Sequence, residues 1–108
     1  MKSKKIDHIA FIVKNIDEGS IFYSKKLGME INFKYHDWAL LSNDSLTLAL
    51  TLEGCHPYHI AVRCETLDEV EEKGYPKEHR DGSVSCYEKD DNGNAIEWIY
   101  YPENKSLI

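Results

Sequence analysis

Two histidines and one glutamate offer the ligand atoms that a divalent metal ion prefers. His8 and His59 each begin the tripeptide His-Ile-Ala, and Glu97 lies in an apolar run near the end of the sequence. Two imidazoles and one carboxylate on one side of an ion leave coordination positions free for a substrate, for oxygen or for water. The alternative is that each histidine is a polar residue near a strand end and that Glu97 is a solvated edge residue.

The two histidines belong to a stretch that the chain repeats once. Residues 7–18 reappear as residues 58–69, at an offset of 51 residues, and a pair of acids follows nine residues after each histidine. A period near 50 with two copies indicates a duplicated supersecondary unit rather than a solenoid.

Each copy predicts a strand, a helix and three further strands. A β-branched apolar run comes first, and a helix start follows, because Asn15 with Glu18 and Thr66 with Glu69 have the spacing of a capping box. The predicted order is therefore βαβββ, twice. The strands are expected at 9–13, 30–35, 38–41 and 46–52 in the first copy and at 60–62, 75–79, 83–89 and 95–101 in the second.

Alternation along the strands predicts which side chains share a face. On the first strand His8 shares a face with Ala10, opposite the bulkier apolar residues that a helix would cover. The same alternation places His59 and Glu97 opposite the better apolar stripes of their strands, so the three side chains are expected to converge on one face. The core is predicted from Ile9, Phe11, Val13, Ile21, Phe22, Leu27, Ile60, Val62, Val70, Ile96 and Trp98.

Composition excludes several classes of partner. The 108 residues carry 13 basic and 19 acidic side chains, a net charge of −6, so nucleic acid is not expected as the main partner. The apolar run 9–13 is too short to span a bilayer or to form a secretory signal, so no membrane partner is expected. Three cysteines without zinc-type spacing predict free thiols and a cytoplasmic protein.

With these motifs in place, the sequence resembles the vicinal oxygen chelate superfamily over nearly its whole length. That superfamily includes glyoxalase I, extradiol dioxygenases, fosfomycin-resistance enzymes, methylmalonyl-CoA epimerase and bleomycin-binding proteins. The stretches that carry the resemblance are His8-Ile9-Ala10, Phe22-Tyr23, Leu27-Gly28-Met29, Tyr58-His59-Ile60-Ala61, Arg80-Asp81-Gly82-Ser83 and Asp90-Asp91-Asn92-Gly93-Asn94-Ala95-Ile96-Glu97.

The resemblance implies a fold and a metal site. The fold is α+β, with two βαβββ modules forming a cup-shaped, eight-stranded mixed sheet. One domain of residues 1–108 is expected, with a first module at about 5–53 and a second at about 57–101. At the family's ligand positions His8, His59 and Glu97 are expected to bind one divalent ion, which is iron, manganese, zinc or nickel.

One position departs from the glyoxalase pattern. Glyoxalase I and the epimerases use a fourth protein ligand, and matching Leu48-Ala49-Leu50 with Ile96-Glu97-Trp98 puts Ala49 at that place. Glu53 has the same parity, but it lies four residues further along, about 13 Å in an extended strand. A three-ligand site resembles extradiol dioxygenases and fosfomycin-type transferases more than an orthodox glyoxalase I.

The spacing of His79, Tyr87 and Gly93 before Glu97 resembles the dioxygenase signature, although Cys86 and Asp91 depart from it. In that family the histidine acts as an acid–base group and the tyrosine donates a hydrogen bond. We accordingly predict Glu97, Tyr87 and His79 as catalytic residues. The alternative is an exposed loop histidine and a tyrosine that lines the cup.

Three further residues are predicted to bind substrate: Arg63, Trp38 and Ser85. Arg63 has the parity of His59 and could bind an anionic group, but an ion pair at the rim is equally compatible. Trp38 lines the cup in one interpretation and packs in the core in the other.

Two functions remain open at this point. The first is a metal-dependent lyase, isomerase or dioxygenase that acts on a small molecule with neighbouring oxygens. The second is a binding protein of the bleomycin-resistance type, without metal or turnover. A homodimer is expected as well, because a short chain leaves sheet edges open and family members commonly dimerise.

Overall fold

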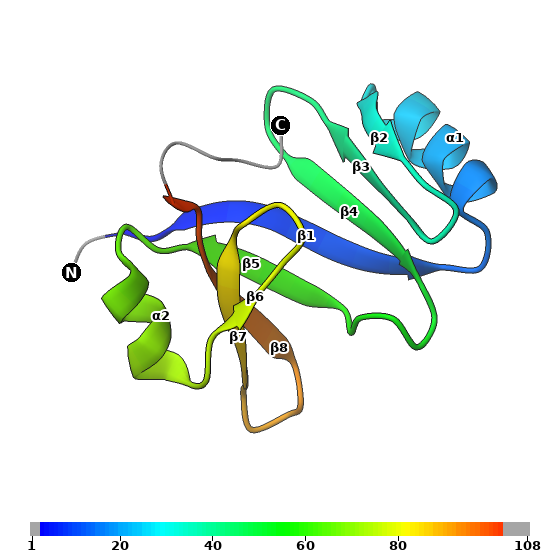
Figure 1. The fold of residues 1–108 in the computed structure, drawn as a ribbon. Helices are drawn as coiled ribbons and strands as arrows, with labels where there is room; N and C mark the ends of the chain where they lie inside the picture. Colours follow the sequence, from blue (N-terminus) through cyan, green and yellow to red (C-terminus); the bar gives the residue numbers. More distant parts are fainter. Residues whose placement is uncertain (1–2, 103–108) are drawn as a thin grey trace. The chain divides into compact units, whose positions relative to one another are not determined.

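The computed structural model describes residues 3–102, which contain two helices and eight strands (Figure 1). Their order repeats βαβββ and confirms the predicted α+β fold with an eight-stranded mixed sheet. The first copy consists of β1 (Lys5–Val13), α1 (Ile16–Leu27), β2 (Glu30–Lys34), β3 (Trp38–Ser42) and β4 (Thr47–Leu52). The second copy consists of β5 (His59–Arg63), α2 (Leu67–Lys73), β6 (Lys77–Glu78), β7 (Val84–Lys89) and β8 (Ala95–Tyr100).

The described residues divide into two compact units. The N-terminal unit comprises His8–His59, and the C-terminal unit comprises the described residues on either side, up to Asp7 and from Ile60 onward. Within residues 3–102, neither helix has the length and apolar character needed to cross a membrane.

In the N-terminal unit the strands lie in the order β2-β3-β4-β1. Strands β2, β3 and β4 pair antiparallel, and β4 then pairs parallel with β1, with Ala10 opposite Ala49. The core of this unit packs under α1, on the face that carries Ile9, Phe11 and Val13, as the alternation predicted. Its buried members are Ile16, Met29, Ala39, Leu41, Leu48 and Leu50.

Helix α1 begins as predicted but buries a different face. Asn15 accepts a hydrogen bond from the backbone N–H of Glu18 at 2.9 Å, and Gly28 ends the helix in the left-handed conformation. The predicted face is wrong, however, because Ile21, Phe22 and Leu27 are about half exposed.

Small residues explain the difference. The buried residues of α1 are Ile16 and Ser20, and a Cβ at Gly19 would lie 3.0 Å from the side chain of Val13. The helix therefore lies close to Val13 of β1 at Gly19 and buries Ile16 and Ser20, while the larger apolar residues Ile21, Phe22 and Leu27 face outward.

In the C-terminal unit the strands lie in the order β5-β8-β7-β6, and β6, β7 and β8 pair antiparallel. Helix α2 covers a cluster of Cys64, Val70 and Cys86. Ile60 was predicted in the core, yet it is 44% exposed. The seven residues of α2 span only about 10 Å and pack mainly against β7 and β8, so this short helix leaves Ile60 on β5 exposed.

Candidate metal centre

The imidazoles of His8 and His59 meet inside the N-terminal unit. Their Nε2 atoms lie 3.4 Å apart, and the rings meet edge to face with centroids 5.4 Å apart. Both residues are buried. The two equivalent histidines of the repeat thus lie together, as the alternation along their strands predicted.

The second nitrogen of His59 fixes which atom carries a lone pair. Its Nδ1 lies 2.8 Å from the carbonyl oxygen of Pro57, and a carbonyl only accepts, so Nδ1 is the donor. In the neutral ring Nε2 then bears the lone pair and faces Nε2 of His8. A backbone carbonyl on the far nitrogen is the usual way in which proteins orient a metal-binding histidine.

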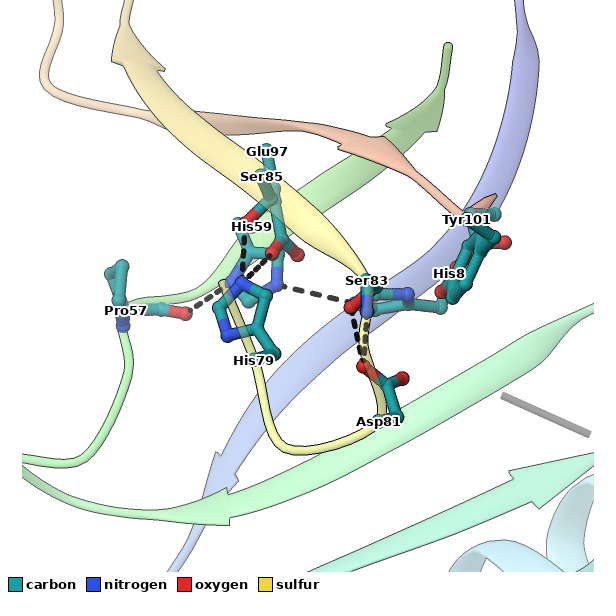
Figure 2. A network of polar contacts seen from close by, with 10 residues as sticks. His8, Pro57, His59, His79, Asp81, Ser83, Ser85, Glu97 and Tyr101 are labelled. Carbon is teal, nitrogen blue, oxygen red and sulfur yellow. Dashed lines mark hydrogen bonds and ion pairs between the residues drawn. The ribbon is translucent and has the colours of Figure 1, made fainter. Parts of the chain in front are cut away.

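Glu97 lies on β8 in the C-terminal unit and is 4% exposed. One of its carboxylate oxygens is 3.7 Å from Nε2 of His79, and the same nitrogen shares a 2.6 Å hydrogen bond with the hydroxyl of Ser85. Figure 2 shows His79 beside both side chains. Tyr87 pairs with Glu97 across β7 and β8, so these residues of the C-terminal unit share one face.

Burial and the Glu97 carboxylate both act on the phenol of Tyr87 on this face. Burial, and then the negative charge of Glu97, raise the pKa of the Tyr87 phenol above its usual value. Tyr87 is therefore a neutral hydrogen-bond donor at ordinary pH. A buried carboxylate is costly unless cations or donors surround it, and a divalent cation meets that need.

His8, His59 and Glu97 form the candidate ligand set, because each is buried and each offers one ligand atom. The donor set fits a divalent transition metal: two neutral imidazoles, one of them with its lone pair fixed, and one anionic oxygen. Ca²⁺ would need more oxygen ligands than this set supplies.

The face that carries His8 continues across β3 and β4. Ala49 pairs with Ala10, and Trp38 pairs with Thr51, which pairs in turn with Ile12. Side chains two residues apart share a face, so Ala49 and Trp38 lie on the face of His8. Ala49 brings no ligand atom to this face, as the sequence indicated. Trp38 is partly buried, with its ring centroid 5.4 Å from that of Tyr35.

Arg63 pairs with a residue that sequence reasoning missed. One of its terminal nitrogens lies 3.2 Å from a carboxylate oxygen of Asp7, and its guanidinium stacks 4.4 Å from the ring centroid of Tyr101. Tyr101 also donates a 2.7 Å hydrogen bond to Asp7. The assignment of Arg63, Trp38 and Ser85 to substrate binding stays a prediction.

All three cysteines are free: Cys64 and Cys86 are buried, and Cys55 is exposed. Burial raises the pKa of both buried thiols, which keeps them protonated and unreactive. The predicted free thiols are thus confirmed.

Comparison with known protein families identifies the superfamily of this chain. The family model of the Glyoxalase/Bleomycin resistance protein/Dioxygenase superfamily matches residues 5–103. The chain belongs to this superfamily, and the resemblance seen in the sequence is confirmed. No curated protein matches the sequence.

Solved structures with different activities share the fold. The Streptomyces coelicolor methylmalonyl-CoA epimerase is 21% identical with a TM-score of 0.72, over 97% of this chain and 99% of that chain. The Mn(II)-bound glyoxalase from Novosphingobium aromaticivorans is 16% identical with a TM-score of 0.69, over 89% of this chain and 37% of that chain. The 2,3-dioxygenase LapB from Pseudomonas sp. KL28 is 18% identical with a TM-score of 0.66, over 95% of this chain and 46% of that chain. At these identities the likeness establishes the fold.

Proposed function

We propose that this protein is a metal-dependent enzyme that acts on a small molecule and that His8, His59 and Glu97 bind one divalent ion. The observation that carries the proposal is the buried histidine pair, in which Nε2 of His59 presents a fixed lone pair 3.4 Å from Nε2 of His8. Two buried imidazoles facing each other through ring nitrogens are the arrangement that a cation would bridge.

Chain continuity supports the participation of Glu97. The boundaries between the two units fall at the peptide bonds Asp7–His8 and His59–Ile60. Each histidine is therefore bonded directly to a residue of the unit that carries Glu97. Strand β5 begins with His59 and continues beside β8, where the N–H of Cys64 donates to the carbonyl of Ile99 at 2.7 Å.

The chemistry follows from the ligand set. A bound divalent ion would act as a Lewis acid toward a substrate with two neighbouring oxygens. Glu97 supplies the negative charge of the site. His79, which shares its hydrogen bond with Ser85, is suited to carry a proton to or from the substrate, and Tyr87 is suited to donate a hydrogen bond to a substrate oxygen.

Two classes of reaction are proposed: a glyoxalase-like reaction, catalysed by a lyase or an isomerase, and a dioxygenase reaction. Arg63, Trp38 and Ser85 are proposed to contact the substrate, with Arg63 suited to an anionic group. The Mn(II)-bound glyoxalase that shares the fold makes Mn²⁺ a natural first ion to test. Zinc, iron and nickel also suit two imidazoles and a carboxylate.

We further propose a cytoplasmic homodimer. Among residues 3–102, β2 pairs only with β3 and β6 only with β7, and on β2 the side chains of Ile31 and Phe33 are substantially exposed. Exposed edge strands tend to be paired. Light scattering at micromolar concentration should give twice 12.5 kDa, and a stable 12.5 kDa species would contradict the dimer.

Metal analysis tests the main proposal. Protein purified without added metal or a histidine tag should bind close to one divalent ion per chain in titrations with Mn²⁺, Zn²⁺, Ni²⁺ and Fe²⁺. His8→Ala and His59→Ala should each abolish tight binding. His36→Ala is the matched control, because its side chain is 93% exposed, and it should bind like the wild type. If the wild type binds none of the four ions, the binding-protein function takes the lead.

A further inference from the structure

A second polar cluster lies in the C-terminal unit and consists of Asp7, Arg63 and Tyr101. Asp7 uses both carboxylate oxygens: one accepts from the Tyr101 hydroxyl at 2.7 Å, and the other lies 3.2 Å from Arg63. The guanidinium of Arg63 also lies over the Tyr101 ring at 4.4 Å, so each member contacts the other two. The Asp7 side chain is 9% exposed and Tyr101 is 8% exposed.

The three members lie on the three segments that carry the proposed metal ligands. Asp7 is bonded to His8 within β1. Arg63 ends β5, four residues after His59 begins it, and Tyr101 follows β8, four residues after Glu97. One compact cluster therefore links all three segments.

The geometry points to Asp7, Arg63 and Tyr101 as positioning residues that set the spacing of the three ligands. This inference rests on the proposed metal site. A hydrogen-bonded strand is stiff over four residues, so joining β1, β5 and the end of β8 at one point restricts where His8, His59 and Glu97 lie relative to one another. Metal ligands must be held within about 0.5 Å of the productive geometry, and loss of supporting contacts typically costs 10–100-fold in metal affinity.

The inferred role is one of positioning, and it adds to the proposed contact of Arg63 with an anionic substrate group. Both oxygens of Asp7 are used within the cluster, and Tyr101 donates its only proton to Asp7. The inferred influence of these contacts on the site passes through the backbone of the strands.

Co²⁺ titration tests the inference, because the visible spectrum of bound Co²⁺ reports both affinity and coordination geometry. Tyr101→Phe removes one hydroxyl and keeps the ring beneath Arg63. We expect its Co²⁺ affinity to fall about tenfold and its Co²⁺ spectrum to change. Tyr100→Phe is the matched control, because it removes the same atom from the neighbouring residue. Tyr100 packs against the hydrophobic cluster of Cys64, Val70 and Cys86 rather than in the polar cluster, so this variant should retain the wild-type spectrum.

A second variant and a folding check keep the test decisive if one substitution unfolds the protein. Asp7→Asn removes the charge that both partners use and should weaken Co²⁺ binding at least as much as Tyr101→Phe. Circular dichroism without metal establishes that each variant is folded at the titration temperature, and Arg63→Gln replaces any variant that is not. A merely structural role would lower the unfolding temperature and leave the Co²⁺ spectrum of the folded protein unchanged.

The outcomes separate the two claims. If the wild type binds no Co²⁺, the proposed metal site fails and this inference fails with it. If the wild type binds Co²⁺ and His59→Ala does not, while the folded Tyr101→Phe and Asp7→Asn proteins bind like Tyr100→Phe, the metal site stands and the positioning role is overturned.

Discussion

Replacing Glu97 with glutamine should leave the protein at least as stable as the wild type without metal, but less stable than the wild type with metal. Glu97 is 4% exposed, and His79 at 3.7 Å is a partner that itself remains 27% exposed. Burying a carboxylate carries a desolvation cost that an uncharged amide of the same shape largely avoids. Without metal, Glu97→Gln should therefore have an unfolding free energy equal to that of the wild type or higher, by up to about 1 kcal/mol.

With metal bound, the wild type should be more stable than Glu97→Gln. An ion at 100 times its Kd stabilises the folded protein by about 2.7 kcal/mol. If loss of the only anionic ligand weakens binding about 100-fold, the same concentration equals the Kd of Glu97→Gln and contributes about 0.4 kcal/mol. The difference of roughly 2.3 kcal/mol corresponds to about 9–18 °C in unfolding temperature for a domain near 100 residues.

Thermal unfolding by circular dichroism, with and without Mn²⁺, measures both halves of this prediction. Glu30→Gln is the control, because this exposed side chain lies on β2 in the other unit and should shift with Mn²⁺ as the wild type does. If Mn²⁺ stabilises Glu97→Gln as much as the wild type, Glu97 is not a ligand. Loss of stability in Glu97→Gln without metal would show that the carboxylate serves the fold.

Other changes have equally definite outcomes. Ala49→Glu adds a carboxylate to the face of His8, so Zn²⁺ affinity measured by competition should rise while metal-free stability falls; unchanged affinity would place Ala49 away from the ion. Gly28→Ala should cost about 1 kcal/mol in urea unfolding, because Gly28 has φ 62° and no atom lies within 4 Å of an added Cβ, so the cost is that of the backbone alone; Gly28→Asn should lose less. Burial, followed by the charge of Asp7, raises the pKa of Tyr101, so the folded protein keeps this proton more tightly than the unfolded chain. Its contribution to stability is therefore complete below pH about 10 and declines above it, and an absorbance titration at alkaline pH should show one fewer late-ionising phenol in Tyr101→Phe. In native protein a thiol reagent should modify one cysteine rapidly, Cys55, and equal rates for all three thiols would contradict the burial of the others.

Local patterns carried most of what the sequence predicted. The capping boxes at Asn15 and Thr66 predicted where both helices begin, since each cap accepts a hydrogen bond from a residue three positions away. Alternation along the strands predicted that His8 and His59 would lie on one face, and their Nε2 atoms do lie close together.

The failures have equally physical causes. The prediction for α1 chose the face with the largest apolar side chains. The helix instead buries Ile16 and Ser20 and lies close to Val13 at Gly19, which has no side chain. The contact of Asp7 with Tyr101 joins residues 94 positions apart, and no local pattern signals such a pair. The two-residue β6 was predicted longer, because a strand ends where its pairing ends and pairing is not local.

The division of the chain into units has a consequence for its synthesis. The N-terminal unit is one continuous segment and can be completed as soon as His59 has left the ribosome. The C-terminal unit needs residues from both ends of the described chain, including the ion pair of Lys4 with Glu69 at 3.0 Å. Closing so long a loop is slow compared with local pairing. The histidine pair therefore belongs to the part that can form first during translation, and Glu97 to the part that must wait for the rest of the chain.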